Sequence, residues 1–124
     1  MKQINDKVQA ILDKIYSNIY EEHTFHNEAT STGNGTALTV GNKKTLTIEI
    51  YGTSSTRLIK FYSKAASGDL RPLMGINIST YEMATQTTGT GEVWQFDITG
   101  LDSVIIDIAA ITGGNVTIKG RAVS

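Results

Sequence analysis

Cysteine is absent from this sequence of 124 residues, and proline occurs once, as Pro72. Without cysteine the chain has no disulfide, no thiolate zinc site, no iron–sulfur cluster and no cysteine nucleophile. Pro72 stands at the entrance of a predicted strand, where its missing amide donor does little harm. The composition therefore excludes thiol chemistry.

The sequence also lacks an excess of charge and any long apolar run. Lys and Arg number 11 and Asp and Glu number 12, so the formal net charge is -1. This balance argues against a nucleic acid or an acidic membrane surface as a partner. No apolar run approaches the roughly 20 residues that span a bilayer, so we expect no membrane insertion. The N-terminal segment MKQINDKVQAILDKIYSN is interrupted by charges, and we therefore expect no signal peptide.

The sequence does contain enough apolar residues for one modest core. Apolar residues make up 40% and charged residues 19%, which is too apolar for a disordered chain. The hydrophobic period changes from helical to alternating near residue 22. We therefore predict an amphipathic helix within residues 1–22 and a β-domain over residues 23–124.

The predicted helix runs from about Lys2 to Tyr20, with no glycine or proline to interrupt it. Four of its apolar residues follow the 4-3-4 spacing of a short coiled coil: Ile4, Val8, Ile11 and Ile15. An isolated helix of this length is marginal in water, so the stripe must pack on something. It either covers the chain's own β-domain or joins copies of the chain. We expect a homo-oligomer, with a trimer favoured and a dimer as the alternative.

Eight segments beyond the helix read as strands because apolar and polar residues alternate along them. Their ranges are 24–28, 37–40, 45–51, 57–64, 73–79, 93–99, 103–111 and 116–123. Short turns such as Gly33-Asn34-Gly35 separate them, too short for the crossovers that parallel strands require. The predicted fold is mainly β: an antiparallel β-sandwich or jelly roll of about eight strands preceded by one N-terminal α-helix.

No constellation of catalytic or metal-binding residues is present. His23 and His26 are the only histidines, and on a strand their separation of three places them on opposite faces. The glycine-rich turns lack the helix and lysine of a phosphate loop. No Gly-x-Ser-x-Gly motif occurs. We therefore expect no enzyme activity, no metal and no cofactor.

Aromatic side chains are the remaining candidates for ligand binding, since flat rings stack on sugar faces. The alternation buries Trp94 but leaves Tyr51 and Tyr62 on outward strand faces. These two tyrosines form a candidate ligand surface for a host cell-surface glycan. Alternatively, they are ordinary residues of a sheet surface, where tyrosine is common.

Three stretches of the chain together resemble a known family. They are FHNEATSTGNGTALTVGNKKTLTIEIYG, LIKFYSKAASGDLRPLMGINIST and WQFDITGLDSVIIDIAAITGGNVTIKGRA. The segment from Phe25 to Ser124 resembles the small β-sandwich domains of structural proteins from tailed bacteriophages and prophages of Gram-positive bacteria. The shared features are turns and core positions, which say more about fold than about role.

The resemblance implies a virion component, either a head fibre or decoration protein or a tail or baseplate appendage. It brings no catalytic residues. Other virion proteins are then the expected partners. The expected location is the virion, after synthesis in the bacterial cytoplasm without a signal peptide. The N-terminal helix lies outside the matching segment, and helices at that position often trimerise or anchor such appendages.

Overall fold

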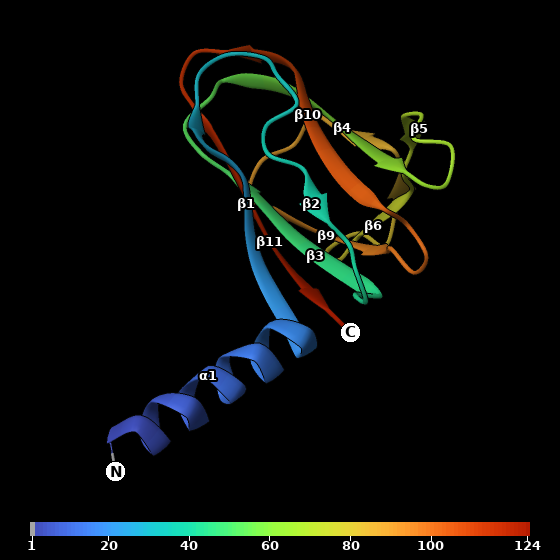
Figure 1. Cartoon of the computed structure of the whole chain (residues 1–124). Coiled ribbons are helices and arrows are strands. Elements are labelled where there is room, and N and C mark those ends of the chain that lie inside the picture. Colours follow the sequence, from blue (N-terminus) through green and yellow to red (C-terminus); the bar gives the residue numbers. More distant parts are fainter. Residues whose placement is uncertain (1) are drawn as a thin grey trace.

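The computed structural model describes the backbone of residues 2–124 and the side chains of residues 5–12 and 19–124. Over this part the chain forms one helix followed by eleven strands (Figure 1). In chain order they are α1 (Lys2–Ile19), β1 (Tyr20–Ala29), β2 (Leu38–Thr39), β3 (Thr45–Tyr51), β4 (Thr56–Lys64), β5 (Arg71–Pro72), β6 (Gly75–Asn77), β7 (Met83–Ala84), β8 (Gln86–Thr87), β9 (Glu92–Asp97), β10 (Ser103–Thr112) and β11 (Val116–Val123).

The strands build two sheets that pack face to face. Sheet A has the strand order β1-β11-β3-β9-β6-β7, and sheet B has the order β2-β10-β4-β5, with β8 also paired to β4. Every pairing between named strands in the described chain is antiparallel. The prediction of a mainly β antiparallel sandwich behind one N-terminal helix is confirmed.

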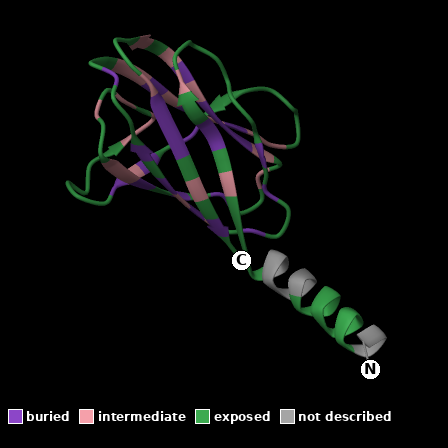
Figure 2. Cartoon of the chain, turned by 90° about the vertical axis from the view of Figure 1, so that its left-hand side faces the viewer, coloured by how far each residue is buried: buried purple, intermediate pink, exposed green. Residues whose placement is uncertain are grey.

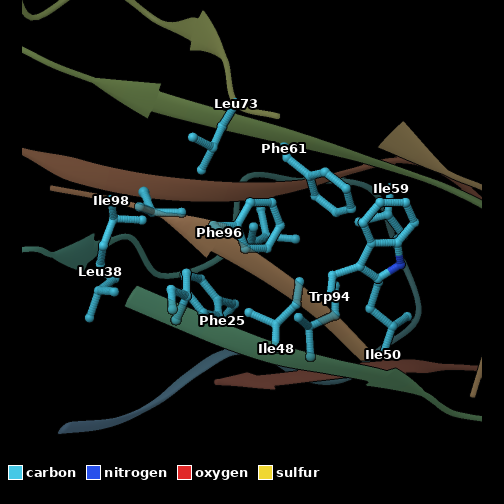
Figure 3. Close-up of a cluster of buried hydrophobic side chains, with 14 of the residues drawn as sticks. Phe25, Leu38, Ile48, Ile50, Ile59, Phe61, Leu73, Trp94, Phe96 and Ile98 are labelled. Carbon is cyan, nitrogen blue, oxygen red and sulfur yellow. The ribbon is translucent and has the colours of Figure 1, made fainter. Parts of the chain in front are cut away.

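The core lies between the sheets and follows the predicted alternation. In β3 the buried side chains are Leu46, Ile48 and Ile50, while Thr45, Thr47, Glu49 and Tyr51 face outward. An aromatic cluster joins the layers (Figure 3): Phe61 from sheet B lies edge-on to Phe96 of sheet A, with ring centroids 4.9 Å apart. The Phe61 ring also lies 5.1 Å from the ring of Trp94. Such aromatic pairs add to the hydrophobic burial that holds two sheets together.

A β-bulge in β1 turns two consecutive side chains inward. The register with β11 shifts between Thr24 and His26, so Phe25 and His26 are both buried. Phe25 fills the space beside Gly120, which has no side chain of its own. The His26 ring crosses to sheet B and donates from Nε2 to the carbonyl oxygen of Ile106, at 2.6 Å. The bulge therefore ties the edge of one sheet to the other.

The observed elements differ from the predicted ones at the short strands. The segment predicted as 73–79 is a strand only over β6, and β5, β7 and β8 were not predicted. A strand of two residues is too short to show an alternation, so periodicity does not detect it.

The boundary between helix and sandwich lies at Ile19 and Tyr20 rather than at residue 22. Tyr20, Glu21 and Glu22 are paired with Val123, Ala122 and Arg121 of β11 and so belong to the sheet.

The helix α1 extends away from the sandwich instead of covering it (Figures 1 and 2). No linker separates it from the sheet, because α1 ends at Ile19 and β1 begins at Tyr20. The carbonyl oxygen of Ile19 accepts a hydrogen bond of 2.9 Å from the backbone N–H of Ser124, which follows β11. The end of the helix is thus seated on the β1–β11 pair.

Substitution of the central aromatic residue of sheet B tests the packing of the two layers. We expect Phe61→Ala to lower the free energy of unfolding by about 3–5 kcal/mol, because it removes a fully buried ring and leaves a cavity. Chemical denaturation followed by Trp94 fluorescence measures this loss. The neighbouring change Tyr62→Ala, on the outer face, serves as the control and should cost about 1 kcal/mol or less. Equal losses for the two variants would contradict this account of the core.

Candidate functional site

The apolar stripe of α1 is the first candidate site. Val8 is 49% exposed and Ile11 is 59% exposed, so neither packs on the sandwich. The side chains of Ile4 and Ile15, which complete the predicted seam, lie outside the described residues. Leu12 and Ile19 are exposed as well. The described residues of the stripe therefore do not cover the chain's own β-domain, which was one of the two alternatives.

The two candidate ligand-binding tyrosines lie on opposite sides of the molecule. Tyr51 ends β3 and is exposed on the outer face of sheet A, whereas Tyr62 is half-buried on the outer face of sheet B. The body of the sandwich stands between them. The structure therefore does not bring them together on one surface, and a ligand that stacks on one ring does not reach the other.

A hollow on the outer face of sheet A is a further candidate site, which the sequence analysis did not identify. Its volume is about 760 Å³, and it lies over β1, β11, β3 and β9. We call it the sheet A groove. Two cross-strand rows form its floor. The first row is Glu22, Arg121, Thr47 and Gln95, and the second is Thr24, Lys119, Glu49 and Val93. Only the strand pairing reveals these rows, because the four strands come from distant parts of the sequence.

Polar contacts organise one end of the sheet A groove. Arg121 forms an exposed ion pair with Glu22, and its guanidinium lies 5.1 Å from the centre of the Tyr20 ring. The hydrogen bond from Arg121 to Glu22 and the charge of Glu22 raise the pKa of Arg121 above its ordinary value. Gln95 donates from Nε2 to the Thr47 hydroxyl at 3.3 Å. The side chains of the first row thus bond in two pairs, Arg121 with Glu22 and Gln95 with Thr47.

The groups that most often carry chemistry are engaged in holding the fold. His23 donates from Nε2 to the carbonyl oxygen of Thr36 at 2.8 Å, and His26 is bonded to Ile106. The described residues contain no group of three or more His, Cys, Asp or Glu side chains placed to hold a metal ion.

Glu92, which the sequence analysis did not single out, is a bridging carboxylate. It accepts hydrogen bonds from the Thr87 hydroxyl at 2.6 Å, the Trp94 indole N–H at 3.1 Å and the Asn77 amide at 3.2 Å. A side chain on Gly89 would collide with this carboxylate. Glu92 therefore fastens the short strands β6 and β8 to β9, and its acceptor capacity is largely used.

No helix in the described part of the chain combines the length and the apolar character that crossing a membrane requires.

Fold and site together define a small β-sandwich module that carries a projecting helix and an open polar groove. The family model of XepA matches residues 19–122, and the chain belongs to the XepA family. Its match begins where α1 ends, so it covers the sandwich.

Two prophage proteins of Bacillus subtilis (strain 168) are similar in both sequence and structure. The SPbeta prophage-derived protein YomS is 41% identical over 101 residues, which are 82% of this chain and 85% of YomS. Its crystal structure superposes with a TM-score of 0.81 at 39% identity and covers 85% of this chain and 93% of that one. The PBSX protein XepA is 39% identical over 103 residues, 83% of this chain, and its crystal structure gives a TM-score of 0.84.

Other relatives are much longer than this chain. Protein YqxG of the same strain is 42% identical over 100 residues, which are 81% of this chain but 34% of YqxG. The match covers 37% of XepA. The chain thus spans about a third of these two relatives and most of YomS. The resemblance to small β-sandwich proteins of prophages is confirmed.

The expected location is wrong. The sequence led us to expect a virion protein that is made in the bacterial cytoplasm without a signal peptide, and the overturned part is the cytoplasmic protein without a signal peptide. The solved structure of XepA is that of a "PBSX exported protein", which points to secretion instead. The charges in the N-terminal segment argue only against an apolar leader, and other export signals have different patterns.

The exposed carboxylate of Asp97, at the rim of sheet A, provides a test of the local geometry. The backbone N–H of Thr99 donates to Asp97 Oδ1 at 3.0 Å, and the backbone and hydroxyl hydrogen bonds of Thr99 lower the pKa of Asp97 below its ordinary value of 3.8. We expect Thr99→Val to raise this pKa part of the way, because the backbone bond remains. An NMR pH titration measures it.

The matched control for Asp97 is Thr45→Val, since Thr45 lies directly opposite Asp97 in the strand pairing. This change should leave the titration of Asp97 where it was. Because the pKa is lower in the folded state, the stabilising contribution of Asp97 is complete above 3.8 and is lost as the pH falls through the folded value. A wild-type pKa at or above 3.8 would refute the described contacts.

Proposed function

We propose that this chain is a non-enzymatic structural protein of a prophage-encoded particle that self-associates through α1. The proposed role is that of a head fibre or decoration protein, or of a tail or baseplate appendage. A trimer is the favoured homo-oligomer and a dimer is the alternative. Other proteins of the same particle are the proposed partners.

The observation that carries this proposal is the uncovered stripe of α1. The helix has 18 residues and projects from the sandwich, with Val8 and Ile11 about half exposed or more. An isolated helix of this size is marginally stable in water, and helical stability in proteins comes mainly from packing of an apolar face. The 4-3-4 spacing suits packing against identical helices. Sister copies supply the cover that the chain's own sandwich does not.

The engagement of His23, His26 and Glu92 supports the non-enzymatic part of the proposal. A catalytic base or nucleophile needs a polar group that is free to meet a substrate. These three side chains instead bond to backbone carbonyls or to neighbouring side chains of the sandwich. Their hydrogen bonds hold loops and short strands in place.

The family supports a role outside the producing cell. XepA is described as an exported protein, and the relatives with closely similar structures come from prophages. We therefore propose that the chain acts after release from the cell that makes it. In YqxG and XepA the matching region is about a third of the protein. The β-sandwich is then one module of those relatives, and the activity of each whole protein depends on further parts of its chain.

A charge placed on the seam of α1 tests self-association. We expect Ile11→Asp to convert the oligomer to a monomer, because burial of an unpaired carboxylate in the helix interface is costly. Multi-angle light scattering on the full chain measures the mass. The matched control is Ala10→Asp, which adds the same charge on the other side of the helix and should leave the oligomer intact. A wild-type chain that is monomeric at all concentrations would refute the proposal.

A carbohydrate-binding module that recognises a host cell-surface glycan is the second candidate function. It is favoured by the sheet A groove, which offers an open polar surface of ligand size. Tyr51 lies on the same outer face of sheet A as this groove, whereas Tyr62 lies on sheet B. This candidate is compatible with the first, because a structural module displayed in several copies can also hold a ligand.

A further inference from the structure

The sheet A groove has the dimensions of a binding site for an elongated ligand. It crosses four adjacent strands of sheet A, β1, β11, β3 and β9, and its volume is about 760 Å³. Neighbouring strands lie about 4.8 Å apart, so three spacings give a floor of about 14 Å. Ligand pockets commonly fall between about 300 and 1,000 Å³. The groove is therefore long enough for a short chain of linked rings.

Several polar groups on the groove floor have no partner among the residues that the structure describes. Glu49 and Lys119 are directly opposite in the strand pairing, yet they form no ion pair among the described side chains. The hydroxyls of Thr24 and Thr45 likewise make no hydrogen bond within the described part of the chain. These donors and acceptors are exposed or half-buried and face the hollow. They are available to a ligand that presents many hydroxyl groups.

The balanced charges of the groove argue against a polyanionic ligand. Glu22 and Glu49 supply two carboxylates, while Lys119 and Arg121 supply two cations, so the formal charge of the floor is zero. A polyanion such as nucleic acid binds through an excess of cations, which this surface lacks. The Tyr20 ring, stacked by Arg121, gives one end of the face a flat aromatic group. Amphipathic aromatic rings suit ligands with both apolar and polar surface.

We propose that the sheet A groove is a binding site for an uncharged oligosaccharide that lies across β1, β11, β3 and β9. This inference rests on the second candidate function and assigns its site to the groove in place of Tyr51 and Tyr62. The hydroxyls of the sugar chain bond to Gln95, Glu49 and Lys119. The ligand stays on the outer face of sheet A and does not enter the core.

An NMR titration of the full chain with chitotetraose and cellotetraose tests the site. Both probes are neutral, extended and rich in hydroxyls. At millimolar probe we expect amide shifts confined to β1, β11, β3 and β9. Gln95→Ala and Lys119→Ala should each weaken binding by about tenfold, which corresponds to loss of about 1.4 kcal/mol of hydrogen bonding. The matched controls on sheet B, Lys60→Ala and Tyr62→Ala, should change affinity by less than about twofold.

The contrary outcomes separate the inference from the function on which it rests. Binding that survives both groove variants but is lost in Tyr51→Ala or Tyr62→Ala overturns the groove site and leaves a carbohydrate-binding function in place. Absence of shifts with either sugar overturns both. Tighter binding of inorganic polyphosphate than of the sugars at the same amides overturns the assignment of a neutral ligand. The spectrum of each variant also reports whether the sandwich is folded.

Discussion

The pairing of β1 with β11 is the contact on which most other features of this structure depend. It runs from Tyr20↔Val123 to Ala29↔Val116 and joins the first strand of the chain to the last. The pairing completes sheet A, places Phe25 beside Gly120 in the core, and brings Glu22 next to Arg121. It also seats the end of α1. Loss of this one pairing would expose the core to solvent. It would also remove β1 from the floor of the sheet A groove and detach the end of α1 from β11.

The bulge at Phe25 and His26 shows how a single irregularity joins two layers. A regular strand would send one of these side chains outward, but the register shift buries both. His26 then reaches the carbonyl oxygen of Ile106 on β10, where β2 is too short to continue the ladder. Gly35 packs against the His26 ring with a φ of +64°, a conformation in which a side chain would collide. The buried His26 ring thereby supplies a hydrogen-bond donor to a backbone carbonyl that β2 leaves unpaired at the edge of sheet B.

Much of the fold was predictable because alternation is a local signal. The inward faces of β3, β4 and β9 follow from their sequences, and Trp94 and Phe61 lie where the period places them. The bulge was not predictable, since nothing local to Phe25 and His26 marks it. Strands β5, β7 and β8 have two residues each, and pairing with longer strands is what defines them. The acceptor role of Glu92 depends on Asn77 and Thr87, which the fold brings to it.

The candidate sites divide along the same line. The stripe of α1 is periodic, so the sequence predicts it, and Val8 and Ile11 are exposed as a surface for association requires. The sheet A groove combines side chains from residues 22 to 123, and no periodicity within one strand predicts it. Tyr51 and Tyr62 share the outward parity of their strands, but parity does not tell which sheet a strand joins. Long-range pairing therefore decides the ligand surface.

The direct passage from Ile19 in α1 to Tyr20 in β1 has a mechanical consequence. Because no residue separates α1 from β1, a bundle of these helices would hold the sandwiches close together at its end. Helices gathered on a common axis would set every sandwich at one radius and one tilt. Each copy would then present its outer sheet at the same angle to a facing surface. The helix bundle would thus set the number and the orientation of the sandwiches, so that weak contacts of each sandwich with a surface would add up to stronger multivalent binding.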